Sequence, residues 1–360
     1  MLARVSRMRL VSGGTTAAVS AALAFAAPSA AGELPRPGDA VASERLAKSA
    51  KRITSYWTPR RMRHAVPLDV EPQPFGSRST SDGSTSPAGE PILVPGDPPV
   101  GTDAPPAPGA GGVNPADELA AAAATASGPI PFTSAELTET TSYPVSTHGI
   151  VFLKLGKFKF SCSATVVQSA TQSIVMTAGH CVHAGGRKGP WATNFLFAPG
   201  YQDKVAPFGT WTAQRLFTTK GWRKHVRFAD DIGAAALHPN AAGQTVESVV
   251  GSRGIAFNLP RDQAYRSYGY PVEPGPKFDG ESLWTCESQF GYTDPYPEPK
   301  GVPQSGIGCD MGGGSSGGSW VVGDAYVNSS NSFGYAFIQN VLFGPYYGNL
   351  AAKVYAAAGG

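Results

Sequence analysis

From about Pro131 onward, short apolar runs recur about every ten residues and are separated by Gly, Pro, Asn and Asp. This spacing is typical of short strands joined by turns, and it predicts an all-β sandwich or set of barrels. The last segment, 346–358, has apolar residues at helical spacing and ends in two glycines, which predicts a C-terminal helix. We expect strands over 149–155, 163–167, 173–177, 194–197, 232–237, 254–257, 282–284, 319–322 and 325–327.

The first 31 residues have the composition of a secretory signal peptide. Arg4, Arg7 and Arg9 supply a positive start, 17–27 is a short apolar run, and 29–31 offers small residues for cleavage. The run is too short to span a membrane comfortably, and the sequence holds no stretch of about 18 apolar residues. We therefore expect an exported, extracellular protein.

Residues 32–131 hold 17 of the 32 prolines and no cysteine. This proline density breaks helices and sheets, and 76–112 has too few large apolar side chains to offset the entropy of ordering. We interpret 32–131 as a propeptide and a Pro/Gly-rich disordered linker. Within it, 41–57 has the spacing of a short helix. The basic stretch that follows, 58–64, is either a solvated segment or part of the propeptide.

The formal net charge of +3 over 360 residues is small. It gives no electrostatic case for nucleic acid or an anionic membrane as a partner. An exported chain with an even number of cysteines is expected to form disulfides. Three pairings are possible, and pairs that are local in the sequence would place one bridge in each half of the domain. The four cysteines are Cys162, Cys181, Cys286 and Cys309.

The first motif that carries chemistry is 177–181 (TAGHC), at the end of a strand-like run. The Ala-Gly pair before His180 allows a tight turn that brings the ring out at a strand end. A metal site here would use His180, Cys181 and His183. That spacing matches no standard zinc pattern and the thiol is expected to be oxidised, so we expect no metal.

The second motif is 230–237 (DDIGAAAL), in which a carboxylate enters a run of small and apolar residues. Asp231 adjoins the apolar run directly. It is either a turn residue before a strand or a buried acid that accepts the Nδ1 proton of a histidine. We expect Asp230 to be the solvated member of the pair.

The third motif is 312–320 (GGGSSGGSW). Composition alone is that of a Gly/Ser linker. However, the stretch is closely bracketed by Cys309 and by the strand-like run at 319–322, so we expect it to lie inside a fold. A nucleophilic serine needs glycine on both sides. Glycine before it lets backbone N–H groups point at a developing oxyanion, and glycine after it lets the substrate approach the backbone closely.

These motifs, in the order His, Asp, Ser, resemble the chymotrypsin/trypsin clan of serine endopeptidases. The closer similarity is to its secreted bacterial branch, which includes the glutamyl endopeptidase-like (V8-like) enzymes. Residues 161–167 resemble the strand that faces the histidine turn in the family, and 344–348 resemble the segment before the terminal helix of that branch. The resemblance covers about 143–358.

The resemblance implies that 132–360 form a trypsin-like domain of two six-stranded antiparallel β-barrels, with the site between them and a C-terminal helix. His180 would be the general base, Asp231 its orienting acid and Ser316 the nucleophile. The backbone N–H groups of Gly314 and Ser316 would form the oxyanion hole. Peptide bonds would be hydrolysed through an acyl-enzyme, with no cofactor.

The two-barrel layout also implies the bridges Cys162–Cys181 and Cys286–Cys309, because each then lies within one half of the domain. The first would tie the turn that carries His180 to the adjacent strand.

Two positions bear on activation and specificity. Ser315 stands where trypsin-like zymogens carry an Asp that pairs with the freed N-terminus, so that switch is absent or different. Asp310 lies six residues before Ser316, where trypsin-like enzymes hold the carboxylate that binds Lys or Arg, although a solvated loop residue is an equal reading. Asn328 and Ser329 are expected to form the other, polar wall of the pocket. With no His at that wall, we favour basic or broad specificity.

We expect a secreted monomer that acts on protein or peptide substrates, with no nucleic-acid or membrane partner. Its mature form is expected to begin between about Gly128 and Tyr143. Two alternatives of other classes are a catalytically inactive protease-like binding protein and a cell-surface structural protein with a Pro-rich stalk. The stalk would account for 76–131 but not for the three motifs.

Overall fold

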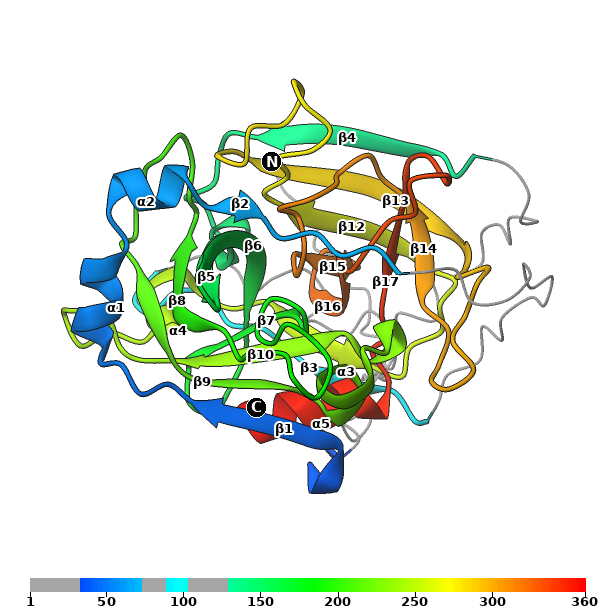
Figure 1. Cartoon of the computed structure of the whole chain (residues 1–360), viewed down its shortest axis with the longest axis horizontal. Coiled ribbons are helices and arrows are strands. Elements are labelled where there is room, and N and C mark those ends of the chain that lie inside the picture. The colour runs from blue at the N-terminus through cyan, green and yellow to red at the C-terminus, as the bar shows by residue number, and fades with distance from the viewer. Residues whose placement is uncertain (1–32, 73–88, 103–128) are drawn as a thin grey trace, which may run out of the picture. The chain divides into compact units, whose positions relative to one another are not determined.

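The computed structural model describes residues 33–72, 89–102 and 129–360. The signal peptide expected over 1–31 lies outside these ranges, as does most of the linker expected over 76–112. Within the described ranges, no helix is both long and apolar enough to cross a membrane. The chain there is built mainly from strands, which lie in two sheets (Figure 1).

The first sheet contains a closed six-stranded antiparallel barrel. Its strands are β5 (His148–Leu155), β6 (Phe158–Val167), β7 (Ile174–Ala178), β8 (Thr193–Pro199), β9 (Trp211–Thr219) and β10 (Ile232–Leu237). They follow the order β9-β10-β7-β6-β5-β8, and β8 pairs with β9 to close the ring. Ala178 of β7 lies opposite Ile232 of β10, which brings the end of β7 beside the start of β10.

The second sheet has nine strands. They are β3 (Ile92–Val94), β4 (Phe132–Leu137), β11 (Gly254–Phe257), β12 (Ala264–Gly269), β13 (Leu283–Thr293), β14 (Ser305–Gly308), β15 (Ser319–Val322), β16 (Tyr326–Ser330) and β17 (Val341–Gly344). The order is β17-β14-β13-β12-β15-β16-β11-β3, and β4 pairs with β13.

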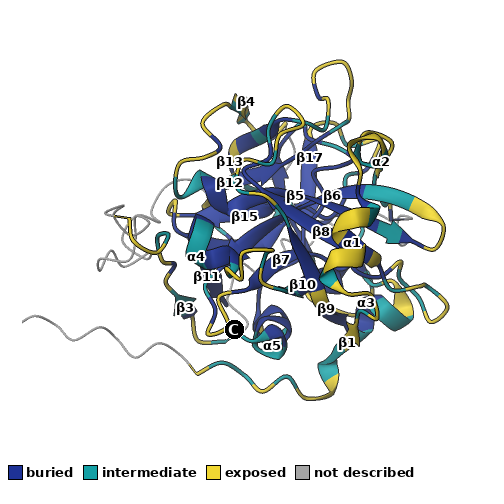
Figure 2. Ribbon diagram, turned by 90° about the vertical axis from the view of Figure 1, so that its left-hand side faces the viewer, coloured by how far each residue is buried: buried dark blue, intermediate teal, exposed yellow. Residues whose placement is uncertain are grey.

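The all-β fold with a C-terminal helix is confirmed, and the first barrel is closed as expected. The second half forms a sheet of nine strands, where a barrel of six strands was expected. The difference arises because β3 and β4 pair with β11 and β13, while β11 pairs in parallel with β16. Figure 2 shows buried residues concentrated in the strands and exposed residues in the connecting loops.

The helix predicted over 346–358 is present as α5 (Asn349–Ala358) and ends at Gly359, whose φ of +113° lies in the left-handed region. One face of α5 is buried against the first barrel and contacts β9 and β10. The hydroxyl of Tyr355 donates to the carbonyl oxygen of Gln168 at 2.6 Å. The ring of Tyr355 lies 5.6 Å from that of Phe257 on β11, so the helix ties the barrel to the second sheet.

The N-terminal segment differs from the expected single helix over 41–57. It forms β1 (Val41–Arg45), which pairs with β9, and then α1 (Ala50–Tyr56). Ile53 and Trp57 are buried in the core shared with the barrel. The apolar residues that resemble one helical stripe are therefore divided between a strand and a helix, because both elements find an apolar partner in the barrel.

Two further strands fall within the region expected to be propeptide and linker. α2 (Pro59–Arg63) is followed by β2 (Val66–Pro67), which pairs with β6, and β3 pairs with β11. Ile92 is buried, which gives this short strand an apolar contact that the composition of its surroundings hides. The remaining elements are η1 (Gly38–Ala40), η2 (Val145–Thr147), α3 (Lys220–His225), η3 (Phe228–Asp230) and α4 (Val246–Val250).

Helix α4 carries a buried carboxyl group, that of Glu247. It accepts hydrogen bonds from the Ser252 hydroxyl at 2.9 Å and from the Ser169 N–H at 3.3 Å. Burial nevertheless raises the pKa of Glu247 from 4.5 to about 7. The folded state thus holds a proton that the unfolded state releases. The stabilising contribution of this group is complete below its unfolded pKa and is lost as pH rises through about 7.

We predict that Glu247→Gln removes this pH dependence. Relative to the wild type, the free energy of unfolding of the variant should rise between pH 4.5 and 7 by at most about 3 kcal/mol. Denaturant unfolding across this pH range measures the difference, with Glu44→Gln at an exposed position as the control. Parallel pH curves for the Glu247 variant and the wild type would contradict the prediction.

Candidate active site

The first half of the site is a buried histidine–carboxylate pair. His180 follows β7 and Asp231 precedes β10, so the register of these two strands sets them side by side. The Nδ1 of His180 lies 2.7 Å from Oδ2 of Asp231, and the backbone N–H of His180 donates to Oδ1, also at 2.7 Å. Both side chains are almost completely buried. The carboxylate therefore fixes both the turn and the ring orientation.

The glycine at position 179 is required by this close approach. A Cβ there would lie 2.8 Å from Oδ1 of Asp231 and 2.9 Å from Oγ1 of Thr218. Any side chain would thus push the carboxylate away from the histidine turn. The Ala-Gly pair read from the sequence as a tight turn also makes room for the acid.

Asp231 has a further partner that the sequence analysis missed. The hydroxyl of Ser332 donates to Oδ2 of Asp231 at 2.6 Å. Ser332 follows β16 of the second sheet, so this bond crosses from one half of the domain to the other. Nothing in the serine-rich stretch 329–332 distinguishes this residue before the sheets are placed together.

The expectation that Asp230 is solvated is wrong. Its side chain is buried, and Oδ2 accepts a hydrogen bond from Nε of Arg227 at 2.6 Å. Burial raises the pKa of Asp230 in spite of the neighbouring guanidinium. The two adjacent aspartates are therefore both buried, but they face different partners, and Asp231 is the one that contacts the histidine.

The second half of the site is the glycine-rich loop at 312–318. The carbonyl oxygen of Ser316 accepts from the N–H of Ser163 on β6 at 2.7 Å, and the hydroxyl of Ser163 donates to the carbonyl oxygen of Gly314 at 3.0 Å. Gly317 has φ of +80°, and a side chain there would clash with Thr177. The loop carrying Ser316 is thereby held against the first barrel, next to the histidine turn.

The structure brings the His180–Asp231 pair close to the Ser316 loop, but the ring of His180 makes no hydrogen bond to that loop in the described ranges. Among the described residues, Nε2 of His180 is buried and has no hydrogen-bond partner. Within the same ranges, no hydrogen bond from the backbone N–H of Gly314 or of Ser316 is found. The site thus presents one unpaired ring nitrogen and two unpaired backbone donors around the Ser316 loop.

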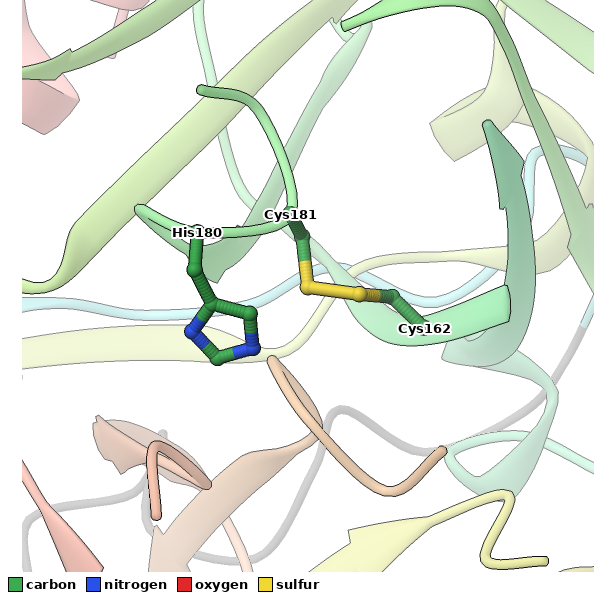
Figure 3. Close-up of side chains that lie close together, drawn as sticks. All are labelled: Cys162, His180 and Cys181. Carbon is green, nitrogen blue, oxygen red and sulfur yellow. A yellow bond between two sulfur atoms is a disulfide. The ribbon is translucent and has the colours of Figure 1, made fainter. Parts of the chain in front are cut away.

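Both predicted disulfides are present, Cys162–Cys181 and Cys286–Cys309. Figure 3 shows the ring of His180 beside the first bridge. The two clusters of potential metal ligands in the described ranges are Cys162, His180 and Cys181, and Cys286, Cys309 and Asp310. Two of three donors in each cluster are disulfide sulfurs, which cannot act as thiolate ligands, so these residues do not fit a metal centre.

A cavity of about 290 Å³ lies beside Ser316. Asp310 lines it, and its carboxylate is paired with Nζ of Lys277 at 2.5 Å. Asn328 and Ser329 do not line it. Their side chains donate to the carbonyl oxygens of Ala256 and Pro345 instead, because β16 turns them into the sheet. The wall opposite Asp310 is formed by the segment after β16, which comprises 331–336.

No protein-family model matches the chain. A curated relative, the "Extracellular metalloprotease" of Bacillus subtilis (strain 168), is 25% identical over 195 residues. The match covers 50% of this chain and 60% of the relative, so the chain spans less than two thirds of that protein.

Solved bacterial protease structures are similar over most of their own length. The protease Anisep from Arthrobacter nicotinovorans is 39% identical over 61% of this chain and 98% of its own, with a TM-score of 0.56. A thermostable serine protease, AL20, from an extremophilic microorganism is 41% identical over 59% and 97%, with a TM-score of 0.54. A Glu endopeptidase shares the fold, at 17% identity over 62% and 95% and a TM-score of 0.50.

We predict that the two disulfides stabilise the fold similarly but affect the histidine turn differently. They close loops of 19 and 23 residues, so removing either by paired Cys→Ala changes should cost about 3 kcal/mol in denaturant unfolding. The Cys162→Ala/Cys181→Ala variant should also speed hydrogen exchange of the amides at 181–183. The Cys286→Ala/Cys309→Ala variant is the matched control. Equal exchange at 181–183 in both variants would show that the first bridge does not hold the turn.

Proposed function

The chain belongs to the chymotrypsin-like clan of bacterial serine proteases, and we propose that it is a secreted endopeptidase using Ser316, His180 and Asp231. The observation that carries this proposal is the buried His180–Asp231 pair, which leaves Nε2 as the free ring nitrogen beside the Ser316 loop. A histidine whose Nδ1 proton is held by a buried carboxylate presents Nε2 as a base. Ser316, which is followed by two glycines and has Gly314 two positions before it, carries the hydroxyl group that we assign to this base.

The mechanism assigns one task to each group. The Oγ of Ser316 attacks the peptide carbonyl while Nε2 of His180 accepts its proton, and His180 then returns the proton to the leaving amine. The N–H groups of Gly314 and Ser316 receive the oxyanion of the tetrahedral intermediate. Water, activated by the same histidine, hydrolyses the acyl-enzyme. The hydroxyl of Ser332 supports the carboxylate of Asp231 throughout these steps.

For the pocket beside Ser316, we infer a preference for uncharged apolar side chains over basic ones. The Nζ of Lys277 is already paired with the carboxylate of Asp310. The same atom lies 4.9 Å from the ring centres of Phe278 and Trp284. A substrate Lys or Arg would have to displace this ammonium. Apolar side chains form much of the lining, namely Met311, Phe333, Ile338, Val341 and Leu342, and the other carboxyl groups that line the cavity are those of Asp69, Glu71 and Glu273. The glutamyl endopeptidase-like branch remains a proposal that substrate profiling decides.

Maturation is proposed to cut the chain before Ile130. β4 at Phe132–Leu137 pairs with β13, and Ile130 is buried against Gly291. A cut inside 130–137 would remove a paired strand from the second sheet. The expected start of the mature form, between about Gly128 and Tyr143, is thereby restricted to the N-terminal end of that range. Sequencing the N-terminus of the secreted, active protein tests the proposal.

The test of function is labelling of the secreted protein by a fluorophosphonate, together with hydrolysis of a peptide library. We predict that Ser316→Ala abolishes labelling and lowers turnover by about 10⁶-fold, the scale observed when the nucleophile of such a triad is removed. Ser315→Ala is the matched control, because its hydroxyl donates to the carbonyl oxygen of Gly312. Loss of labelling in the Ser315 variant alone would identify Ser315, and not Ser316, as the nucleophile. A wild type that never labels would favour the binding-protein alternative.

The adjacent aspartates give a second matched pair. We predict that Asp231→Asn leaves the fold intact and lowers turnover by about 10⁴-fold through the wrong histidine tautomer, a magnitude taken from the same change in a known triad of this kind. Asp230→Asn should keep turnover within about tenfold, because Asp230 contacts Arg227 and not the histidine. Steady-state kinetics with circular dichroism distinguishes the two. The reverse pattern would exchange their roles.

The specificity inference is tested by freeing Asp310. We predict that Lys277→Met raises kcat/KM for substrates with Arg at the cleaved bond, relative to Leu, by about two- to fivefold, the scale of one partly exposed ion pair. Lys300→Met, at an exposed position, is the control. An unchanged ratio, or a wild type that already prefers Arg, would rule out neutralisation of the pocket by Lys277.

A further inference from the structure

The cavity beside Ser316, which we call the groove, is lined in part by a segment from the N-terminal part of the same chain. β2 pairs in parallel with β6, with Val66 opposite Phe160 and Pro67 opposite Ser161. The pairing continues as the N–H of Leu68 donates to the carbonyl oxygen of Ser161 at 3.0 Å. In Figure 1, the segment that follows β2 runs from β6 towards the strands of the second sheet. We call residues 67–71 the strap.

Alternate side chains of the strap enter apolar clusters on the two sides of the groove. Leu68 is buried in the core of the first barrel. Val70 packs against the aromatic cluster that includes Trp222, Phe228 and Phe333. An extended chain whose alternate side chains fill successive pockets, while its backbone adds to a sheet edge, is the usual arrangement of a bound peptide.

The two acidic residues of the strap lie beside the Ser316 loop and beside the segment that follows β16. A Cβ placed on Gly313 would lie 3.3 Å from the Cβ atoms of both Pro67 and Asp69. Glu71 accepts a hydrogen bond from the N–H of Ala336 at 3.1 Å. Asp69 and Glu71 line the same cavity as Ser316, so the strap forms part of the wall of the space that a substrate would use.

We propose that the strap is a peptide ligand of the groove and that it blocks substrate binding until it is displaced. The inference rests on the proposed function, because it takes the Ser316 groove as the substrate site. Among the described residues, the N–H groups of Gly314 and Ser316 donate no hydrogen bond to the strap. No strap carbonyl therefore occupies the donor pair that would hold a scissile bond, so the strap is bound without being positioned for cleavage.

Non-covalent contacts of the segment before the strap also hold it on the first barrel, so a covalent link to residues 129–360 is not required. The indole N–H of Trp57 donates to the carbonyl oxygen of Asn194 on β8 at 2.5 Å, and Ile53 is fully buried. Together with the pairing of β1 to β9, these contacts hold 41–57 on the barrel. A cut before Ile130 therefore leaves the strap in place as a non-covalent inhibitor, and full activity requires its dissociation or further degradation.

The first experiment uses the full chain and measures peptide hydrolysis while gels establish that the chain is intact. Leu68→Asp places a charge in the apolar pocket, and it should raise kcat/KM of the intact chain by about 10- to 100-fold, as expected for the loss of one buried leucine. Val100→Asp, an exposed aliphatic residue outside the strap, is the control and should change it by less than about twofold.

A second measurement covers the case in which Leu68→Asp disturbs folding. A synthetic peptide of residues 65–72 (AVPLDVEP) is added to the processed, active protein after separation from its N-terminal fragment. It should inhibit competitively with the peptide substrate, and the same peptide carrying Leu68→Asp should not.

Three outcomes decide between the proposals. Intact Leu68→Asp and wild-type chains that label with fluorophosphonate and cleave peptide equally fast would overturn the strap while leaving the endopeptidase function in place. Failure of the 65–72 peptide to inhibit the processed protein would overturn it as well. Absence of fluorophosphonate labelling in every variant would remove the proposed function itself, and the inhibitory role of the strap with it.

Discussion

The rest of the site depends on one buried carboxylate. Asp231 has no exposed surface, and a buried charge of this kind is tolerated only when it is fully hydrogen-bonded. Its oxygens receive the backbone N–H and the Nδ1–H of His180 from the first barrel and the hydroxyl of Ser332 from the second sheet. Satisfying this one group therefore requires both halves of the domain to be folded and correctly placed.

The same requirement explains why small residues surround the site. Three donors reach Asp231 only if the chain passes close to it, and this is why position 179 has no room for a Cβ. The Ser316 loop meets a similar constraint from β6, since Ser163 holds it by two hydrogen bonds. The glycines that read as a flexible linker in the sequence are, in the structure, places where two backbones approach too closely for a side chain.

The sequence was sufficient to predict the fold class and to single out the local motifs that the structure brings together. TAGHC, the DDIG run and GGGSSGGSW are each short, and the strand spacing around them predicted the all-β fold and the terminal helix. Partners that come from distant strands were not predictable. Ser332 acquires its role only when β16 is placed beside β10, and Asp230 is buried because Arg227 folds back onto it through η3.

The N-terminal region illustrates a different limit. A prediction from composition considers only the apolar surface that a segment can bury within itself. By that criterion, 32–131 is unable to fold. Val41, Ile53 and Ile92 are instead buried or half-buried against a core built by the rest of the chain. Strand pairing with β9, β6 and β11 satisfies their backbone groups. Poor intrinsic folding propensity therefore does not separate a linker from a segment that folds on a partner surface.

Strand β6 contacts both the proposed catalytic residues and the proposed inhibitory strap. Cys162 and Ser163 anchor the histidine turn and the Ser316 loop, and the preceding residue, Ser161, accepts the backbone of the strap. These three consecutive residues lie on β6, so a segment that pairs with β6 at Ser161 lies next to the histidine turn and the Ser316 loop. The strap and the Ser316 loop are therefore both hydrogen-bonded to the same strand. The strap can block the groove without distorting the His180–Asp231 pair, whose hydrogen bonds are complete while it is bound. Under the proposed function, displacement of the strap would therefore expose a site in which the His180–Asp231 pair is already formed.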